Sequence, residues 1–121
     1  MKKRVAILGA SPNPQRYANM AQKQLLAKGH EVILVSPRYD EVEGLPCSSD
    51  VKNINEPIDT LTLYVNAEKS SAMADSILSL QPKRVIFNPG TENPELQKRL
   101  VAKNIEALEA CTLVLLSLDQ F

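Results

Sequence analysis

Hydrogen-bond donors gather directly behind the first apolar run of this chain, in a segment that opens with Gly9. They are the N–H groups and side chains of Ser11, Asn13, Gln15, Arg16 and Tyr17. A buried strand that turns into a helix presents free N–H groups and the positive end of the helix dipole to an anion. The segment therefore predicts a binding site for phosphate groups.

This loop differs from the GxGxxG pattern of dinucleotide-binding proteins. Ser11 stands in the place of the second glycine and Pro14 in the place of the third. Pro12 and Pro14 have no N–H to donate. We therefore expect a stiff loop that depends on its side chains for binding.

Arg16 is the most informative residue of the loop. We expect Asn13 to cap the following helix and Pro14 to be its first residue, which places Arg16 in the first helical turn. A cation there opposes the helix dipole at a cost of up to about 1 kcal/mol, and a bound anion would reverse that effect. Arg16 is a candidate phosphate ligand, and a solvated arginine is the alternative interpretation.

A second polar cluster, Ser36, Pro37 and Arg38, follows the apolar run at 31–35. Sites for NAD usually have Asp or Glu at this position to bind the ribose hydroxyls. A cation instead of a carboxylate favours a nucleotide whose ribose is phosphorylated, which is NADP or coenzyme A.

Three further candidates follow two later strands: Asn66, Asn88 and Gly90. Both asparagines can either cap the next segment or bind a ligand. Gly90 is expected to supply a turn.

Apolar runs predict strands over 4–8, 31–35, 60–65, 84–87 and 105–108. Helical spacing predicts helices over 14–28 and 67–80, a helix capped by Asn93 and ended near Asn104, and a closing helical turn over 113–118. Residues 37–59 are expected to form a long loop with at most a helical turn at 50–53. Together these ranges predict an α/β fold with a doubly wound, five-stranded parallel sheet. Such a sheet binds its ligand at the carboxyl ends of its strands.

The whole chain has 121 residues, the length of one domain, which we assign to 1–121. Fourteen basic residues balance fourteen acidic ones, which argues against a nucleic-acid partner. No apolar run reaches the ~20 residues that span a membrane, and the N-terminus is not typical of a secretory signal. A cytoplasmic protein that does not bind membranes is expected.

Metal and catalytic sites are not predicted. Cys47 and Cys111 lack the spacing of a metal site and are expected to be reduced thiols. The single histidine, His30, begins a strand and so lies far from the carboxyl-end loops.

Several segments, in this order, resemble the small stand-alone CoA-binding proteins, which are similar to the nucleotide-binding domain of the succinyl-CoA synthetase alpha subunit. They are Val5–Ser11 with Asn13, Pro14 and Tyr17, then Val35–Pro37, Leu63–Ala67, Phe87–Gly90 and Cys111. The resemblance implies a CoA-binding Rossmann-like domain with strand order 3-2-1-4-5. It also implies that Cys111 is either a buried filler or a neighbour of the CoA thiol.

The resemblance also assigns roles to the candidate residues. It places Ser11, Asn13, Gln15, Arg16 and Tyr17 along the phosphates, Ser36, Pro37 and Arg38 near the adenosine, and Val65 and Asn66 beside the adenine or pantetheine. Arg38 becomes the candidate for the 3′-phosphate.

The sequence thus predicts a protein that binds coenzyme A or an acyl-CoA without catalysis, with a ligase-like protein or a second copy as the candidate protein partners. Two alternatives stay open. The same loop and the cation at Arg38 fit an NADP-binding redox or sensor domain. Phe87 and Asn88 replace the usual Trp-Leu-Gln before Pro89 and Gly90, which fits a ligand-free interaction module.

Overall fold

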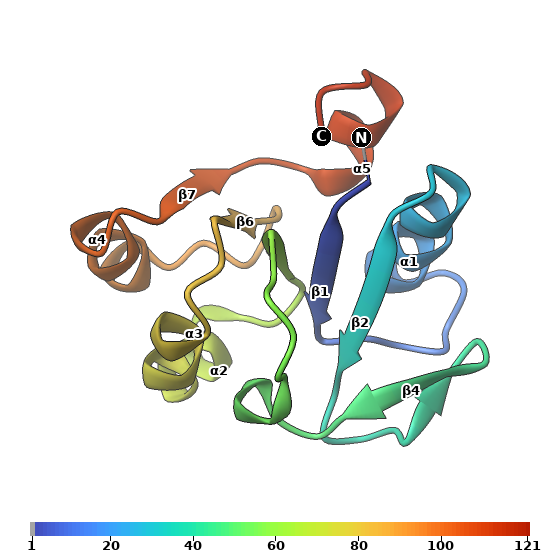
Figure 1. The fold of residues 1–121 in the computed structure, drawn as a ribbon, viewed down its shortest axis with the longest axis horizontal. Helices are drawn as coiled ribbons and strands as arrows, with labels where there is room; N and C mark the ends of the chain where they lie inside the picture. The colour runs from blue at the N-terminus through green and yellow to red at the C-terminus, as the bar shows by residue number, and fades with distance from the viewer. Residues whose placement is uncertain (1) are drawn as a thin grey trace.

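The computed structural model describes residues 2–121, in which helices alternate with the strands of one sheet (Figure 1). The strands are β1 (Arg4–Leu8), β2 (Glu31–Val35), β3 (Glu41–Val42), β4 (Leu45–Ser48), β5 (Thr60–Leu63), β6 (Arg84–Phe87) and β7 (Glu106–Glu109). The helices are α1 (Tyr17–Ala27), α2 (Ala67–Ala72), α3 (Ala74–Leu80), α4 (Pro94–Ala102) and α5 (Thr112–Ser117), with a 3₁₀ turn at Val51–Asn53.

The sheet has seven strands in the order β3-β4-β2-β1-β5-β6-β7. Every neighbouring pair is parallel except β3 and β4, which form an antiparallel hairpin. β1 lies between β2 and β5, so its backbone is paired on both edges. Strands covered on both faces are expected to be apolar throughout, and Val5–Leu8 is buried throughout.

Helices cover both faces of the sheet, and each face has its own core. In Figure 1, α2, α3 and α4 lie on one side, and α1 and α5 on the other. Leu8 and Phe87 belong to the first core, with Ile77 of α3 and Leu100 of α4. Ile7 belongs to the second core, with residues of α1 and α5. The alternation of side chains along β1 therefore holds two helical layers on one sheet.

The five predicted strands are all present, but the predicted sheet was incomplete. Two short strands, β3 and β4, lie in the segment expected to be a loop. Their hairpin turns at Glu43 and Gly44, both at positive φ, which is the geometry of a two-residue hairpin turn. β3 has only two residues, and Pro46 interrupts the apolar pattern of β4. Neither strand therefore shows a long apolar run.

The predicted order 3-2-1-4-5, applied to the five predicted strands in chain order, was wrong. The third predicted strand is β5, and it pairs with β1 rather than with β2. The position beside β2 belongs to β4. Strand order depends on contacts between distant segments, and the missed hairpin occupied the position that we gave to β5.

Helix ends agree with the prediction where a cap is clear and differ elsewhere. Asn93 caps α4, because its Oδ1 accepts the N–H of Leu96 at 3.1 Å. The first helix begins later than predicted, with Arg16 at its N-cap position rather than in its first turn. The predicted helix over 67–80 is divided into α2 and α3 at Met73. The turn at Val51–Asn53 and the closing helix α5 were both predicted.

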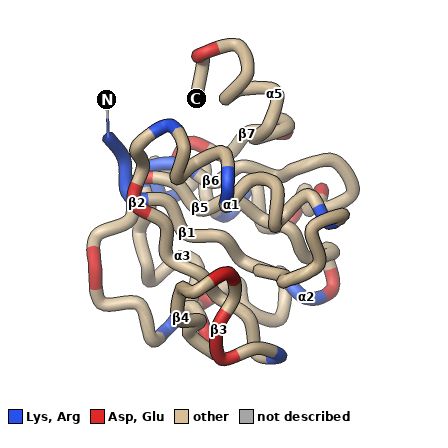
Figure 2. Tube along the Cα trace, turned by 90° about the vertical axis from the view of Figure 1, so that its right-hand side faces the viewer, with Lys and Arg blue, Asp and Glu red and all other residues tan. Residues whose placement is uncertain are grey.

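Charged residues are spread over the molecule. Figure 2 shows basic and acidic positions interspersed along the trace, without a large basic face in that view. Within residues 2–121, no helix is long and apolar enough to cross a membrane.

Candidate functional site

A cleft of about 870 Å³ opens at the carboxyl ends of four neighbouring strands, β2, β1, β5 and β6. Its lining comes from the loops after those strands, from the first turn of α1 and from one side of α2. Of the thirteen candidates, eleven line it: Gly9, Ser11, Asn13, Arg16, Tyr17, Ser36, Pro37, Arg38, Val65, Asn66 and Gly90. Gln15 and Asn88 are not among the lining residues.

Gly9 allows the floor of the cleft to form. Its φ is +100°, a conformation that other residues rarely adopt. A Cβ atom at this position would lie 3.0 Å from the carbonyl oxygen of Tyr64 and 3.0 Å from Cγ1 of Val65. Glycine is therefore required both by the backbone conformation and by the close approach of the loop after β5.

The loop after β1 uses many of its N–H groups for its own folding. The N–H of Asn13 donates to Ser11 Oγ at 3.2 Å, and the N–H of Gln15 donates to Asn13 Oδ1 at 3.0 Å. The N–H of Arg16 donates to the carbonyl oxygen of Asn13 at 3.0 Å. Three of the five predicted backbone donors are therefore already occupied, because Asn13 forms a turn instead of capping the helix.

Three N–H groups of this region remain available to a ligand. Those of Ser11, Tyr17 and Ala18 have no hydrogen-bond partner within residues 2–121. Tyr17 and Ala18 are the first two residues of α1, where the helix dipole favours an anion. All three residues line the cleft.

Asn19 fixes this loop from below. It is fully buried, and its Nδ2 donates to the carbonyl oxygen of Ser11 at 3.0 Å and to Glu43 Oε2 at 2.9 Å. The hydrogen bonds from Asn19 and Lys23 lower the pKa of Glu43. The loop after β1 is therefore tied through Asn19 to the β3–β4 hairpin.

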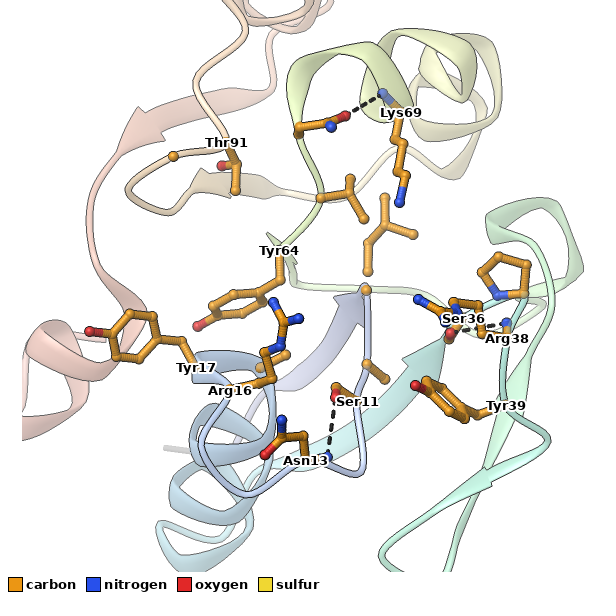
Figure 3. A pocket seen from close by; sticks show the side chains of 18 of the residues that line it. Ser11, Asn13, Arg16, Tyr17, Ser36, Arg38, Tyr39, Tyr64, Lys69 and Thr91 are labelled. Atoms are coloured by element: carbon orange, nitrogen blue, oxygen red, sulfur yellow. Dashed lines mark hydrogen bonds between the residues drawn. The ribbon is translucent and has the colours of Figure 1, made fainter.

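The lining of the cleft is cationic. Arg16, Arg38 and Lys69 line it, and no Asp or Glu does so within the described residues. None of these three cations is in a salt bridge with another described residue. Figure 3 shows them on three sides of the opening, Arg16 on the loop after β1, Arg38 after β2 and Lys69 on α2.

The loop after β2 forms one end of the cleft. The N–H of Arg38 donates to Ser36 Oγ at 3.2 Å, so the buried Ser36 fixes the turn that presents Arg38. The Arg38 guanidinium lies 5.9 Å from the centre of the Tyr39 ring. Arg38 is exposed, so its guanidinium remains accessible from the opening beside this cation–π contact.

The start of α2 forms another side of the cleft. Asn66 caps this helix, because its Oδ1 accepts the N–H of Lys69 at 2.9 Å. The buried Asn93 of the α4 cap donates through Nδ2 to Ser70 Oγ at 2.8 Å and to Ser71 Oγ at 2.9 Å. The first turn of α2, and with it the backbone of Lys69, is thus fixed from two directions.

Tyr64 forms part of the wall near Arg16 (Figure 3). Its hydroxyl is buried and has no hydrogen-bond partner within residues 2–121. Burial raises the pKa of this phenol to about 12, so the side chain is neutral at physiological pH.

Asn88 has a role inside the protein. Its Nδ2 donates to Thr62 Oγ1 at 2.6 Å and to the carbonyl oxygen of Leu63 at 2.8 Å. Its Oδ1 accepts the N–H of Thr112 at 2.9 Å, at the start of α5. The buried side chain therefore joins β5, β6 and α5, with both ends of its amide in use.

The single histidine and Cys111 lie away from the cleft lining. The Nδ1 atom of His30 accepts the N–H of Lys3 at 3.0 Å, beside the amino ends of the strands, as predicted. Cys111 occupies the N-cap position of α5 and does not line the cleft. The described part of the chain has no group of three or more His, Cys, Asp or Glu residues arranged to hold a metal.

Several lining residues were not predicted from the sequence, chiefly Tyr39, Tyr64, Lys69, Met73 and Thr91. Tyr64 and Tyr39 each directly adjoin a predicted candidate in the sequence. Lys69 lies three residues after Asn66, and helical spacing places such residues on the same side. That spacing was the available signal for Lys69.

The family model described as "CoA binding domain" matches residues 3–117 of this chain. The uncharacterized protein YneT of Bacillus subtilis (strain 168) is 31% identical over 101 residues, which span 84% of this chain and 75% of that protein. A crystal structure described as an uncharacterized protein is 45% identical, with a TM-score of 0.95. The match covers 100% of this chain and 99% of that one.

A shorter match relates the chain to part of an enzyme. Acetate–CoA ligase (ADP-forming) I of Archaeoglobus fulgidus is 36% identical over 64 residues. These residues span 53% of this chain and only 9% of the ligase.

Proposed function

The chain belongs to the CoA-binding domain family, and from that premise we propose that it binds coenzyme A or an acyl-CoA and catalyses no reaction on it. The observation that carries the proposal is the cleft of three cations, with no carboxylate from the described residues in its lining. Coenzyme A carries a pyrophosphate and a separate 3′-phosphate, and such groups are bound by arginine, lysine and free N–H donors.

The arrangement of donors suits these two phosphate groups. The free N–H groups of Ser11, Tyr17 and Ala18 and the side chain of Arg16 would bind the pyrophosphate. Arg38, at the other end of the cleft, would bind the 3′-phosphate. Val65 and Asn66 would contact the adenine or pantetheine portion.

The chemistry of the lining supports binding without catalysis. No Asp, Glu, His or Cys of the described chain lines the cleft, so it lacks the carboxylate, imidazole and thiol groups that most often act in acyl transfer. The acetate–CoA ligase that resembles this chain is a far longer protein, of which the chain matches only 9%.

Isothermal titration of the purified protein with CoA and with dephospho-CoA tests the proposal. We expect saturable binding of CoA and weaker binding of dephospho-CoA, because the latter lacks the phosphate assigned to Arg38. No heat of binding with either compound at millimolar concentration would disprove the function. Mass spectrometry of small molecules released from freshly purified protein would identify any acyl group.

NADP is the second candidate ligand. Arg38 occupies the position after β2 where NAD sites have a carboxylate, and this favours any nucleotide with a phosphorylated ribose. Mixing the protein with NADPH and following the nicotinamide fluorescence separates the two, because we expect no enhancement if CoA is the ligand.

A ligand-free interaction module is the third candidate. A thermal-shift panel of nucleotides tests it, because stabilisation by any of them contradicts a lost ligand site. Co-purification of a ligase-like subunit would instead favour it. A single domain over 1–121, a cytoplasmic location and a weak homo-oligomer stay predictions.

A further inference from the structure

Lys69 is the cation of the cleft that no sequence pattern singled out, and its position suggests a specific task. It lies on α2, and in Figure 3 its side chain extends from that helix into the opening between Arg16 and Arg38. The floor below this part of the opening is formed by the loop that begins at Gly9. Lys69 therefore approaches the same space as the free N–H groups of α1, but from the opposite wall.

The protein places the Lys69 backbone firmly while leaving its ammonium group free. The Lys69 N–H is bound to Asn66, and the neighbouring Ser70 is fully buried and bound to Asn93. The Lys69 side chain is exposed and forms no salt bridge with a described residue. A rigid backbone with a free charge is the arrangement expected of a ligand-binding lysine.

The charge balance of the cleft points the same way. Three cations without a lining carboxylate give the cleft an excess of positive charge, and these like charges repel one another. A ligand with several negative charges removes that repulsion. Arg38 stands at one end of the cleft, so Arg16 and Lys69 are left to share the phosphates at its centre.

We infer that Lys69 closes the pyrophosphate site from the α2 side, opposite Arg16 and the N-terminus of α1, and leaves the 3′-phosphate to Arg38. This inference rests on the proposed function. It makes Lys69 a general affinity residue for ligands with a pyrophosphate, and makes Arg38 the residue that distinguishes coenzyme A from dephospho-CoA.

The test compares two ligands across five proteins by isothermal titration. The ligands are CoA and dephospho-CoA, and the proteins are the wild type, Lys69→Met, Lys69→Arg, Arg38→Met and the control Lys98→Met. Methionine keeps an unbranched, flexible stem at the position and removes the charge. Lys98 is an exposed residue of α4 outside the cleft lining, so its variant has the same change of net charge.

We expect Lys69→Met to weaken both ligands by a similar factor of about 10 or more, the size of a lost charge-assisted hydrogen bond. Arg38→Met is expected to weaken the binding of CoA and to leave the affinity for dephospho-CoA nearly unchanged. Lys98→Met should match the wild type, and Lys69→Arg should retain most of the affinity.

Two results would overturn the inference while the proposed function stands. One is a wild type that binds CoA and a Lys69→Met variant that binds as well as Lys98→Met. The other is a Lys69→Met variant that loses affinity for CoA alone, which would assign the 3′-phosphate to Lys69. A wild type that binds neither ligand would overturn the proposed function itself. Thermal unfolding of each variant verifies that it is folded.

Discussion

At the level of single residues, the cleft depends first on Gly9, where the chain leaves the central strand. Gly9 combines a positive φ with a close approach to Tyr64 and Val65. Gly29 also has a positive φ, of +86°, but an added Cβ would meet nothing within 4 Å. Alanine substitutions at these two glycines therefore separate the loss of stability due to backbone conformation from the loss due to the close contact.

Gly9→Ala is expected to destabilise the protein by about 2 kcal/mol or more, and Gly29→Ala by about 1 kcal/mol. Both variants incur the conformational strain, but only Gly9→Ala brings a methyl group 3.0 Å from a backbone oxygen. Urea unfolding followed by circular dichroism measures both. Equal losses of stability would show that the contact at Gly9 is unimportant.

Arg16 is the side chain that we propose as the main ligand of the pyrophosphate. Arg16→Ala is expected to weaken CoA binding by about 1 to 3 kcal/mol, the range for losing a hydrogen bond to a charged group. Titration calorimetry measures the change, and Lys98→Ala is the matched loss of one exposed positive charge. An unchanged affinity would remove Arg16 from the site.

His30 makes stability depend on pH near neutrality. Burial, followed by the charge of Lys3, lowers the pKa of this imidazole from its usual 6.5. The unfolded chain therefore binds the proton more readily, and stability that is complete above pH about 6.5 is lost as the pH falls toward the lowered value. Protonation of Nδ1 would also break its hydrogen bond from the Lys3 N–H.

We expect the urea midpoint of the wild type to fall between pH about 7.5 and about 5.5, and that of His30→Gln to change less. The carboxyl pKa values of Glu31 and Glu43 are lowered from the usual 4.5, so both groups titrate below this range. Parallel pH profiles of the two proteins would contradict this role of His30.

At the level of helices and strands, the N-cap of α4 also positions α2. The Oδ1 of Asn93 caps α4, while its Nδ2 binds Ser70 and Ser71. One buried amide thus joins two helices, and α2 presents Lys69 to the cleft.

Asn93→Ala is expected to cost about 2 kcal/mol of stability, because it removes a cap and a hydrogen bond to the buried Ser70 hydroxyl. It should also weaken CoA binding by releasing the start of α2. Chemical unfolding and titration measure the two effects, and the exposed Asn55→Ala is the control. Stability equal to that of the control would refute the joint role of Asn93.

At the level of the whole molecule, the sheet brings cations from three loops to one edge, although basic and acidic residues balance overall. The net charge of the chain is zero, so the excess of positive charge is local to the cleft. Ligand binding should therefore respond to ionic strength even in a protein without net charge.

CoA affinity is expected to fall several-fold between about 50 mM and about 300 mM sodium chloride, because salt screens the partly exposed cations. The dependence should be weaker in Lys69→Met, which has one cation fewer. Calorimetric titrations at a series of salt concentrations provide the measurement. An affinity that is independent of salt would argue against phosphate recognition by these side chains.

The sequence alone determined the local features of this protein. Apolar runs predicted five of the seven strands, and the Asn93 cap predicted where α4 begins, because these signals lie within a few neighbouring residues. The predicted CoA-binding family is confirmed by the match over residues 3–117. Most of the candidate residues line one cleft for a related reason, since parallel strands end at the same edge of a sheet.

Only the tertiary structure decided which distant segments meet. It put β5 beside β1, inserted the β3–β4 hairpin next to β2, and brought Lys69 across from Arg16. It also turned Asn88 from a candidate ligand-binding residue into a link between β5 and α5. Such pairings depend on side chains packing and hydrogen bonding across the sheet, between residues that are far apart in the sequence and share no local signal.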